Sequence, residues 1–143
     1  MSIRILILCT GNSCRSQMAE GFLKSFDSEL AVYSAGTEPE LQVNPKAVQV
    51  MKEIGIDISD NFTKSVNFFT HKSFDFVITV CDNAKETCPI FLGNVENKIH
   101  IGFEDPSKIN GNESEVLSAF RKTRDEIKEA FKEFYKQYIY VLK

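Results

Sequence analysis

The sequence has few of the residues that form linkers between domains. It contains only 7 Gly and 4 Pro among 143 residues, and no stretch is rich in Pro, Gly or Ser. A chain of this length with 43% hydrophobic residues matches the usual size of one compact domain around a single core. We therefore predict a single domain covering residues 1–143.

An excess of positive charge is also absent. Lys and Arg number 17 against 20 Asp and Glu, and the net charge is -3. The two signs are scattered along the chain, which leaves no basic face for nucleic acid or anionic lipid. The apolar run at residues 5–9 is far too short to span a membrane, and it lacks the flanks of a signal peptide. We expect no nucleic-acid or membrane partner and a cytoplasmic location.

Four cysteines are too few to define a function by themselves. Without an export signal they are expected to be reduced thiols that are catalytic, metal-binding or inert. A metal site lacks partners, because the only histidines, His71 and His100, have no ligand spacing to a pair of cysteines. We therefore expect no metal ion and no cofactor.

Apolar segments of strand length alternate with segments of helical periodicity. The predicted strands are residues 3–8, 31–34, 76–80 and 98–101. Helices are predicted to begin at Ser16, at Pro45 and near Ser114, while residues 59–72 contain at most a short helix. This alternation predicts an α/β single-domain three-layer fold with a mainly parallel four-stranded sheet flanked by helices. Its ligand site is expected beyond the carboxyl ends of the strands.

The second predicted helix has clear signals at both of its ends. Asn44 is a favourable N-cap, Pro45 suits the first helical position, and Gly55 is expected just past the end. Its inward face is predicted from the apolar residues Ala47, Val48, Met51 and Ile54.

The first predicted strand ends at a loop with the pattern Cys-x5-Arg, and a helix follows at once. The loop and the residue after it are Cys9, Thr10, Gly11, Asn12, Ser13, Cys14, Arg15 and Ser16. In such a loop successive backbone N–H groups converge, and the helix adds its own N–H groups and positive dipole end. Residues 10–16 are therefore predicted to bind a tetrahedral oxyanion that faces Cys9.

Individual side chains in this loop suit nucleophilic chemistry. Arg15 offers a planar fork of donors for two oxygens, and Ser16 is placed to donate to the Cys9 sulfur. The positive field is expected to lower the pKa of Cys9, to roughly 3.5–7.5 in sites of this kind. Gly11 and Asn12 tolerate positive φ values. The alternative is that Cys9 is a small buried hydrophobe and Arg15 a surface residue.

Two further residues are interpreted in relation to this loop. Asp105 follows the fourth predicted strand, and its carboxylic acid could protonate the oxygen that a nucleophile expels. Asp-Pro is also a common turn signal, so this interpretation depends on the presence of Cys9. Cys14 is predicted to be inert and packed.

The loop, with Gln17-Met18-Ala19-Glu20 and Ser34-Ala35-Gly36, resembles that of the low-molecular-weight protein tyrosine phosphatase superfamily. The resemblance covers nearly the whole chain and includes Asp105-Pro106. Within this superfamily the chain is more similar to the thioredoxin-coupled arsenate reductases than to the phosphatases. The segments that carry this closer similarity are Asn44-Pro45-Lys46-Ala47, Cys81, Thr87-Cys88-Pro89 and Gly102-Phe103-Glu104-Asp105-Pro106.

The resemblance implies reduction of arsenate to arsenite by a relay of three cysteines, with thioredoxin as the partner. In that relay Cys9 attacks arsenate, Arg15 holds its oxygens, and Asp105 protonates the departing hydroxyl. Cys81 then attacks the Cys9 sulfur, and arsenite leaves with the bonding electrons. Cys88 finally attacks Cys81 and carries the disulfide to a surface where thioredoxin reduces it.

The spacing of the second and third cysteines has a structural consequence. Cys81 and Cys88 are seven residues apart, and seven helical residues rise about 10.5 Å, beyond the roughly 7 Å limit between the Cα atoms of a disulfide. We predict that the polar segment at residues 82–87, before Pro89, loops out on oxidation, which would change the amide protection of residues 82–92.

The chain departs from its relatives at two informative positions. Members that bind potassium beside the loop use residues like Asn12, Glu20 and Ser34 with an acid near position 64, where this chain has Lys64. The Lys64 ammonium is expected to replace the cation. Ser107 stands where the phosphatases have an aromatic residue that would sandwich a phosphotyrosine ring, which argues against that substrate.

Two other functions stay open at this point. One is a phosphatase that hydrolyses phosphate monoesters through a Cys9 phosphoenzyme. The other is an inactive oxyanion-binding or redox-sensing module that signals through Cys81 and Cys88. The C-terminal aromatics Tyr135, Tyr138 and Tyr140 are expected to cover the core, and a monomer is expected.

Overall fold

The computed structural model describes residues 2–82 and 90–143, and its centre is a parallel sheet. The strands are β1 (Arg4–Cys9), β2 (Ala31–Gly36), β3 (Ser73–Thr79) and β4 (Asn94–His100). Their order in the sheet is β2-β1-β3-β4, and every adjacent pair is parallel. The predicted four-stranded α/β sheet is confirmed, and all its carboxyl ends lie at one edge.

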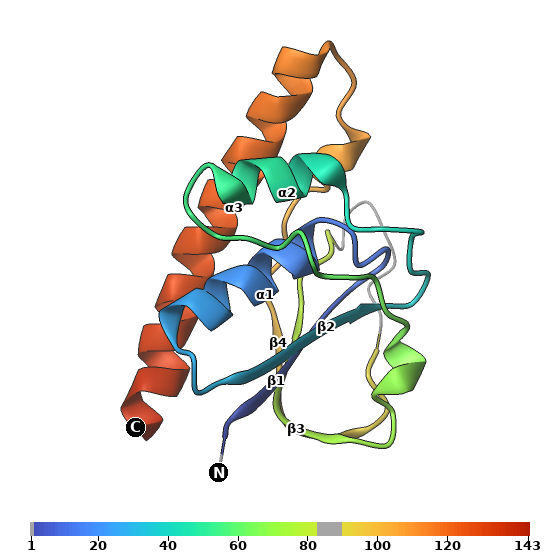
Figure 1. Ribbon diagram of the computed structural model, residues 1–143. Coiled ribbons are helices and arrows are strands. Elements are labelled where there is room, and N and C mark those ends of the chain that lie inside the picture. The colour runs from blue at the N-terminus through green and yellow to red at the C-terminus, as the bar shows by residue number, and fades with distance from the viewer. Residues whose placement is uncertain (1, 83–89) are drawn as a thin grey trace.

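Helices cover one face of this sheet, and short segments cover the other (Figure 1). The α-helices are α1 (Arg15–Phe26), α2 (Pro45–Lys52) and α3 (Glu113–Phe134), and α3 packs against both α1 and α2. The 3-10 helix η1 (Val66–Phe68) lies on the opposite side. The remaining short helical turns are η2 (Pro106–Lys108), η3 (Tyr135–Ile139) and η4 (Tyr140–Leu142).

The alternation of side chains along β1 explains why the strand is apolar throughout. Ile5 and Ile7 belong to the larger core beneath the helices, whereas Leu6 and Leu8 belong to a second cluster on the opposite face. All four side chains are fully buried. A strand covered on both faces has no polar side, as expected of the centre of a parallel sheet.

The start of α2 and the turn after it follow their predicted signals. The Asn44 side chain accepts a hydrogen bond from Lys46 N at 2.9 Å, and Pro45 occupies the first turn. Gly55 adopts a φ of +82° just past the helix. The prediction that Ile54 faces inward is wrong, because α2 ends at Lys52 and Ile54 is 37% exposed. Val50 is buried on the inner face instead.

The third and fourth strands begin earlier than their apolar residues predict. β3 begins at Ser73 rather than residue 76, and β4 begins at Asn94 rather than residue 98. Most of β4 is exposed because this strand forms the edge of the sheet. Polar residues therefore pair in the ladder there without a hydrophobic pattern to reveal them.

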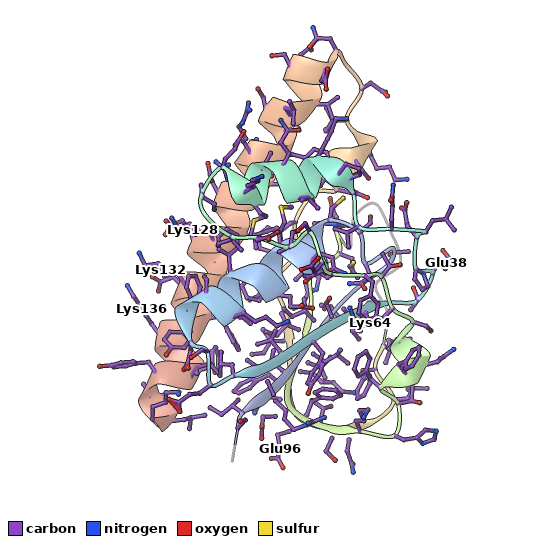
Figure 2. The ribbon with its side chains drawn as sticks, viewed as in Figure 1. Glu38, Lys64, Glu96, Lys128, Lys132 and Lys136 are labelled. Atoms are coloured by element: carbon purple, nitrogen blue, oxygen red, sulfur yellow. The ribbon has the colours of Figure 1, made fainter. Side chains whose placement is uncertain are left out.

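Exposed charges line the outer face of α3 and of η3, which follows it. Lys128, Lys132 and Lys136 repeat at intervals of four and point away from the sheet (Figure 2), while Phe131 and Phe134 point into the core. In the part of the chain that the structure describes, no helix is both long enough and apolar enough to cross a membrane.

The packing of α3 on the sheet side can be tested with Phe131→Ala. The Phe131 ring is fully buried and contacts the rings of Phe103 and Phe134, so its removal should lower the free energy of unfolding by about 3–5 kcal/mol. Phe68→Ala makes the same change at a 74% exposed ring and should cost under about 0.5 kcal/mol. Urea denaturation of both variants measures the difference, and equal losses would contradict this packing.

Candidate active site

The predicted oxyanion loop joins the centre of the sheet to the first helix. Cys9 is the last residue of β1 and Arg15 is the first of α1, so residues 10–14 form the connection. This confirms the predicted order of strand, loop and helix. The nucleophile candidate therefore lies at the carboxyl end of a central strand, beside the N-terminus of a helix.

Backbone hydrogen bonds from a second segment hold the carbonyls of this loop from outside. Glu38 N donates to Thr10 O at 2.9 Å, Glu40 N to Gly11 O at 3.0 Å, and Asn44 N to Ser13 O at 2.9 Å. The carbonyls of Thr10, Gly11 and Ser13 are therefore satisfied by residues 38–44. Asn12 N points to the Cys9 sulfur, at 3.1 Å.

Gly36 allows the second segment to approach the loop closely. It pairs with Cys9 at the ends of β2 and β1, and a Cβ atom there would lie 2.3 Å from Thr10 O. Only a residue without a side chain fits this position. In the sequence, Gly36 stands out only through the Ser34-Ala35-Gly36 resemblance. The need for glycine comes from the contact between the end of β2 and the loop after β1, which the sequence does not reveal.

Of the two loop residues that tolerate positive φ values, one adopts such a conformation. Asn12 has a φ of 53° and is fully buried. Gly11 does not have a positive φ, so its tolerance of that conformation is not used. Its small size matters instead, because a Cβ atom would lie 3.0 Å from Cγ of Glu40.

The Cys9 sulfur is buried and receives donors from two neighbours. The residue is 2% exposed, and its sulfur lies 2.9 Å from Ser16 Oγ and 3.1 Å from Asn12 N. Burial raises the pKa of Cys9, and this outweighs Ser16, Arg15 and Asn12, which lower it. The expectation of a lowered pKa is therefore wrong for this structure, because the site removes the sulfur from water as well as surrounding it with donors.

Arg15 connects the loop with the predicted acid. Its guanidinium is 4% exposed, and Nη1 donates to Phe103 O at 3.1 Å. Nη2 lies 3.5 Å from Asp105 Oδ2. The Asp105 side chain keeps 21% of its surface exposed and accepts hydrogen bonds from Ser107 N and Oγ. Cys9, Arg15 and Asp105 are thus brought together at one end of the sheet.

The other three cysteines differ in their surroundings. Cys14 is buried with its sulfur 3.6 Å from Ser13 Oγ, and burial raises its pKa to about 12, which keeps the thiol protonated. Cys81 is fully buried and disulfide-bonded, whereas Cys9 and Cys14 are free. Cys88 lies outside the described residues, as does most of the segment predicted to loop out.

A buried carboxylate lies behind the loop, near the predicted cation position. Glu20 is 4% exposed, and it accepts from Ser34 Oγ at 2.7 Å and from Lys24 Nζ at 2.8 Å. Lys64 Nζ instead donates to Phe62 O at 2.8 Å, although Glu20 attracts its charge. The ammonium bonded to Glu20 is therefore that of Lys24, whereas Lys64 was expected to replace the cation.

Lys64 and Glu38 belong to two adjacent segments at the carboxyl edge of the sheet (Figure 2). Thr63 Oγ1 donates to Glu40 O at 2.6 Å, and Gly36 N donates to Lys64 O at 2.9 Å. Within residues 2–82 and 90–143, no cluster of three or more His, Cys, Asp or Glu residues has the arrangement of a metal site.

The whole domain matches a known family. Residues 4–139 match the model of the low molecular weight phosphotyrosine protein phosphatases. The chain belongs to this family. Its relatives include an arsenate reductase from Halalkalibacterium halodurans, 47% identical over 91% of this chain and 93% of the relative. An arsenate reductase from Bacillus subtilis is 45% identical, also over 91% of this chain and 93% of its own length.

Solved structures of this phosphatase family and its reductase members share the fold. A structure described as an arsenate reductase in the phosphate-binding state has a TM-score of 0.75 and 30% identity, covering 94% of this chain and 98% of its own. A thioredoxin-dependent arsenate reductase from Corynebacterium glutamicum has a TM-score of 0.59 and 25% identity. That match covers 92% of this chain and 61% of the other.

Gly36→Ala tests the approach of β2 to the phosphatase-family loop. The added Cβ displaces Thr10 O, so the N–H groups should move and phosphate binding should weaken by about tenfold or more in calorimetry. Gly55→Ala is the matched control. Its positive φ costs about 1–2 kcal/mol of stability, but the site is untouched. Equal phosphate affinities in the two variants would contradict the steric role of Gly36.

Ser16→Ala tests the effect of the hydroxyl on the nucleophile. The Ser16 hydrogen bond lowers the pKa of Cys9, so its loss should raise that pKa further. At any pH below the midpoint the thiolate fraction then falls, and alkylation of Cys9 by iodoacetamide should slow by about tenfold for a shift of ~1 unit. Ser25→Ala, on the exposed side of α1, should leave the profile unchanged. An unshifted profile in Ser16→Ala would exclude this hydrogen bond as a determinant.

Proposed function

We propose that this chain reduces arsenate to arsenite with three cysteines, Cys9, Cys81 and Cys88, and that thioredoxin returns it to the reduced state. The observation that carries the proposal is a free cysteine in the loop together with a second cysteine that forms a disulfide. Cys9 is free beside Arg15 and Asp105, while Cys81 is disulfide-bonded in the same domain. Relatives named arsenate reductases, 45–47% identical over 91% of the chain, support the same substrate.

The first step uses the groups that the loop brings together. The Cys9 thiolate attacks the arsenic atom, and a hydroxyl leaves as water after taking a proton from Asp105. Residues 10–16 bind the other oxygens through their N–H groups, with the Arg15 guanidinium bound to two of them. A bond between sulfur and arsenic forms, and the arsenic is still pentavalent.

The second step moves the electrons. The Cys81 thiolate attacks the Cys9 sulfur, and the two electrons of the bond between sulfur and arsenic pass to arsenic. Arsenite leaves as the trivalent product, and a Cys9–Cys81 disulfide remains. Cys88 then attacks Cys81, which frees Cys9 as a thiolate and leaves the disulfide between Cys81 and Cys88. A dithiol such as thioredoxin supplies the two electrons that restore both thiols.

The thiol states in the structure fit the last stage of this cycle. Cys9 is free and Cys81 is in a disulfide, which is the distribution that remains after Cys9 has been released. A phosphatase needs one thiolate and finishes by hydrolysis, so a second reactive thiol has no use in it. We propose that the protein acts as a cytoplasmic monomer with arsenate and thioredoxin as its partners.

Hydrolysis of phosphate monoesters through a Cys9 phosphoenzyme is the alternative that family membership favours. The loop is suited to it, because phosphate and arsenate have the same shape and charge. Ser107 argues against an aryl phosphate, since its hydroxyl donates to Asp105 at 2.7 Å and offers no ring surface to the substrate.

Counting free thiols separates the functions. One stoichiometric pulse of arsenate to the fully reduced protein should remove two thiols per arsenite formed, because the two electrons come from a pair of sulfurs. Thiol labelling and arsenite chromatography measure the two quantities. A phosphatase or an oxyanion-binding module would keep all its thiols through the pulse.

Variants at the three positions should fail at different stages. Cys9→Ser should abolish arsenate and phosphate-ester chemistry together. Cys88→Ser should complete one turnover and stop at the Cys9–Cys81 disulfide, identified by mass spectrometry. Sustained turnover with thioredoxin in either variant would contradict the assigned roles.

A further inference from the structure

A buried amide on α1 contacts the active-site loop from behind. Gln17 is fully buried, and its Nε2 lies 3.0 Å from Asn12 O, 3.2 Å from Asn12 Oδ1 and 3.1 Å from Phe62 O. Its Oε1 accepts from Asn61 Nδ2 at 3.0 Å. An amide has two hydrogens, so one serves Phe62 and the other is shared by the two oxygens of Asn12. Both polar side-chain atoms of Gln17 are therefore hydrogen-bonded.

The carboxylate of Glu20 fixes the direction of this chain of amides. Glu20 is bonded to the ammonium of Lys24 and accepts from Asn61 Nδ2 at 3.4 Å. Asn61 therefore presents its NH₂ group to Glu20 and to Gln17, and Gln17 must present its oxygen to Asn61. The NH₂ group of Gln17 is then directed toward Asn12, and the opposite orientation would place oxygen against three oxygens.

Asn12 continues this series of oriented hydrogen bonds as far as the Cys9 sulfur. Its side-chain Nδ2 donates to Ser16 Oγ at 2.7 Å, which leaves the Ser16 hydrogen for Cys9 Sγ at 2.9 Å. Its backbone N donates to the same sulfur at 3.1 Å. Asn12 holds both donors in place only while it keeps its φ of 53°, a conformation that costs free energy outside glycine.

We propose that Gln17 is a positioning residue for the nucleophile, holding Asn12 in its left-handed conformation so that Asn12 N and Ser16 Oγ stay aimed at the Cys9 sulfur. Gln17 does not touch the reacting atoms. Its two contacts with Asn12 and one with Phe62 tie the loop to the segment at residues 61–64, where Lys64 N also donates to Asn12 Oδ1 at 3.0 Å. The role deepens the proposed function, and it rests on that function only in taking Cys9 as the nucleophile.

Gln17→Met tests the role, because methionine fills the same volume without donors or an acceptor. The full chain, with arsenate absent, is alkylated with iodoacetamide across a pH series, and mass spectrometry follows Cys9 alone. The groups that face Cys9 and also carry charge or titrate are Arg15 and Cys14, with Asp105 behind Arg15, and all remain in the variant. The midpoint of the profile should rise by ~1 unit, and alkylation below the midpoint should slow about tenfold.

Gln49→Met is the matched control, since Gln49 is an exposed helical position on α2. Its profile should coincide with that of the unaltered chain. If Gln17→Met folds and its profile also coincides, the proposal is overturned. If it does not fold, Asn61→Ala decides, because it removes the donor that orients Gln17 and should shift the same midpoint by a smaller amount. An unchanged midpoint in Asn61→Ala would then overturn the proposal.

The two proposals fail separately. Alkylation needs no arsenate, so a shifted profile with no arsenate reduction by the unaltered chain would retain the role of Gln17 and remove the proposed function. If the unaltered chain reduces arsenate but Gln17→Met leaves the profile unshifted, the proposed function stands and the role of Gln17 is overturned.

Discussion

The site depends on hydrogen bonds that residues 38–44 donate to the outer carbonyls of the loop. The N–H groups of Glu38, Glu40 and Asn44 bind the carbonyls of Thr10, Gly11 and Ser13. A short loop has one N–H and one C=O per residue, and it cannot turn its donors inward unless its acceptors are satisfied elsewhere. The nearby strand end, with Gly36 against Thr10 O, makes that arrangement possible. The conformation of the loop is therefore set by two segments.

Burial and hydrogen bonding act on the nucleophile in opposite directions. A thiolate that is removed from water loses solvation, and the donors around it restore part of that loss. In Cys9 the loss is the larger, so its pKa is raised although Ser16, Asn12 and Arg15 all favour the charged form. The guanidinium of Arg15 also contacts Asp105 and Phe103 O, and these acceptors offset part of the positive field that it exerts on Cys9. The pKa of Cys9 then depends on how well each donor is aligned with the sulfur. The amides of Gln17 and Asn61 matter because they hold Asn12, which carries one of these donors.

Much of the fold could be predicted because its signals are local. The β1 sequence is apolar on both faces, Asn44 and Pro45 begin a helix, and Gly55 follows its end, and the structure confirms each of these. The start of β4 could not be predicted, because exposed edge residues such as Asn94 pair through the backbone whatever their side chains are. The first residue of β3, the exposed Ser73, pairs with Asn94 and was missed for the same lack of an apolar signal. The helical period places Ile54 on the inner face of α2, but a periodic pattern does not reveal the residue at which a helix ends, and α2 ends before Ile54.

The sequence by itself determined the chemistry of the site: a thiol, a guanidinium and a carboxylic acid, each placed after a strand or at the start of a helix. The sequence specifies these residue types directly. Because the strands are parallel, their carboxyl ends lie at one edge of the sheet, and the three groups are expected there. Only the tertiary structure decided how the groups act on one another. The upward shift of the Cys9 pKa, the pairing of Lys24 rather than Lys64 with Glu20, and the contact of Gln17 with Asn12 all depend on distances between segments far apart in the chain. Desolvation and hydrogen-bond direction are set by packing in three dimensions, and residue spacing along the sequence carries no measure of either.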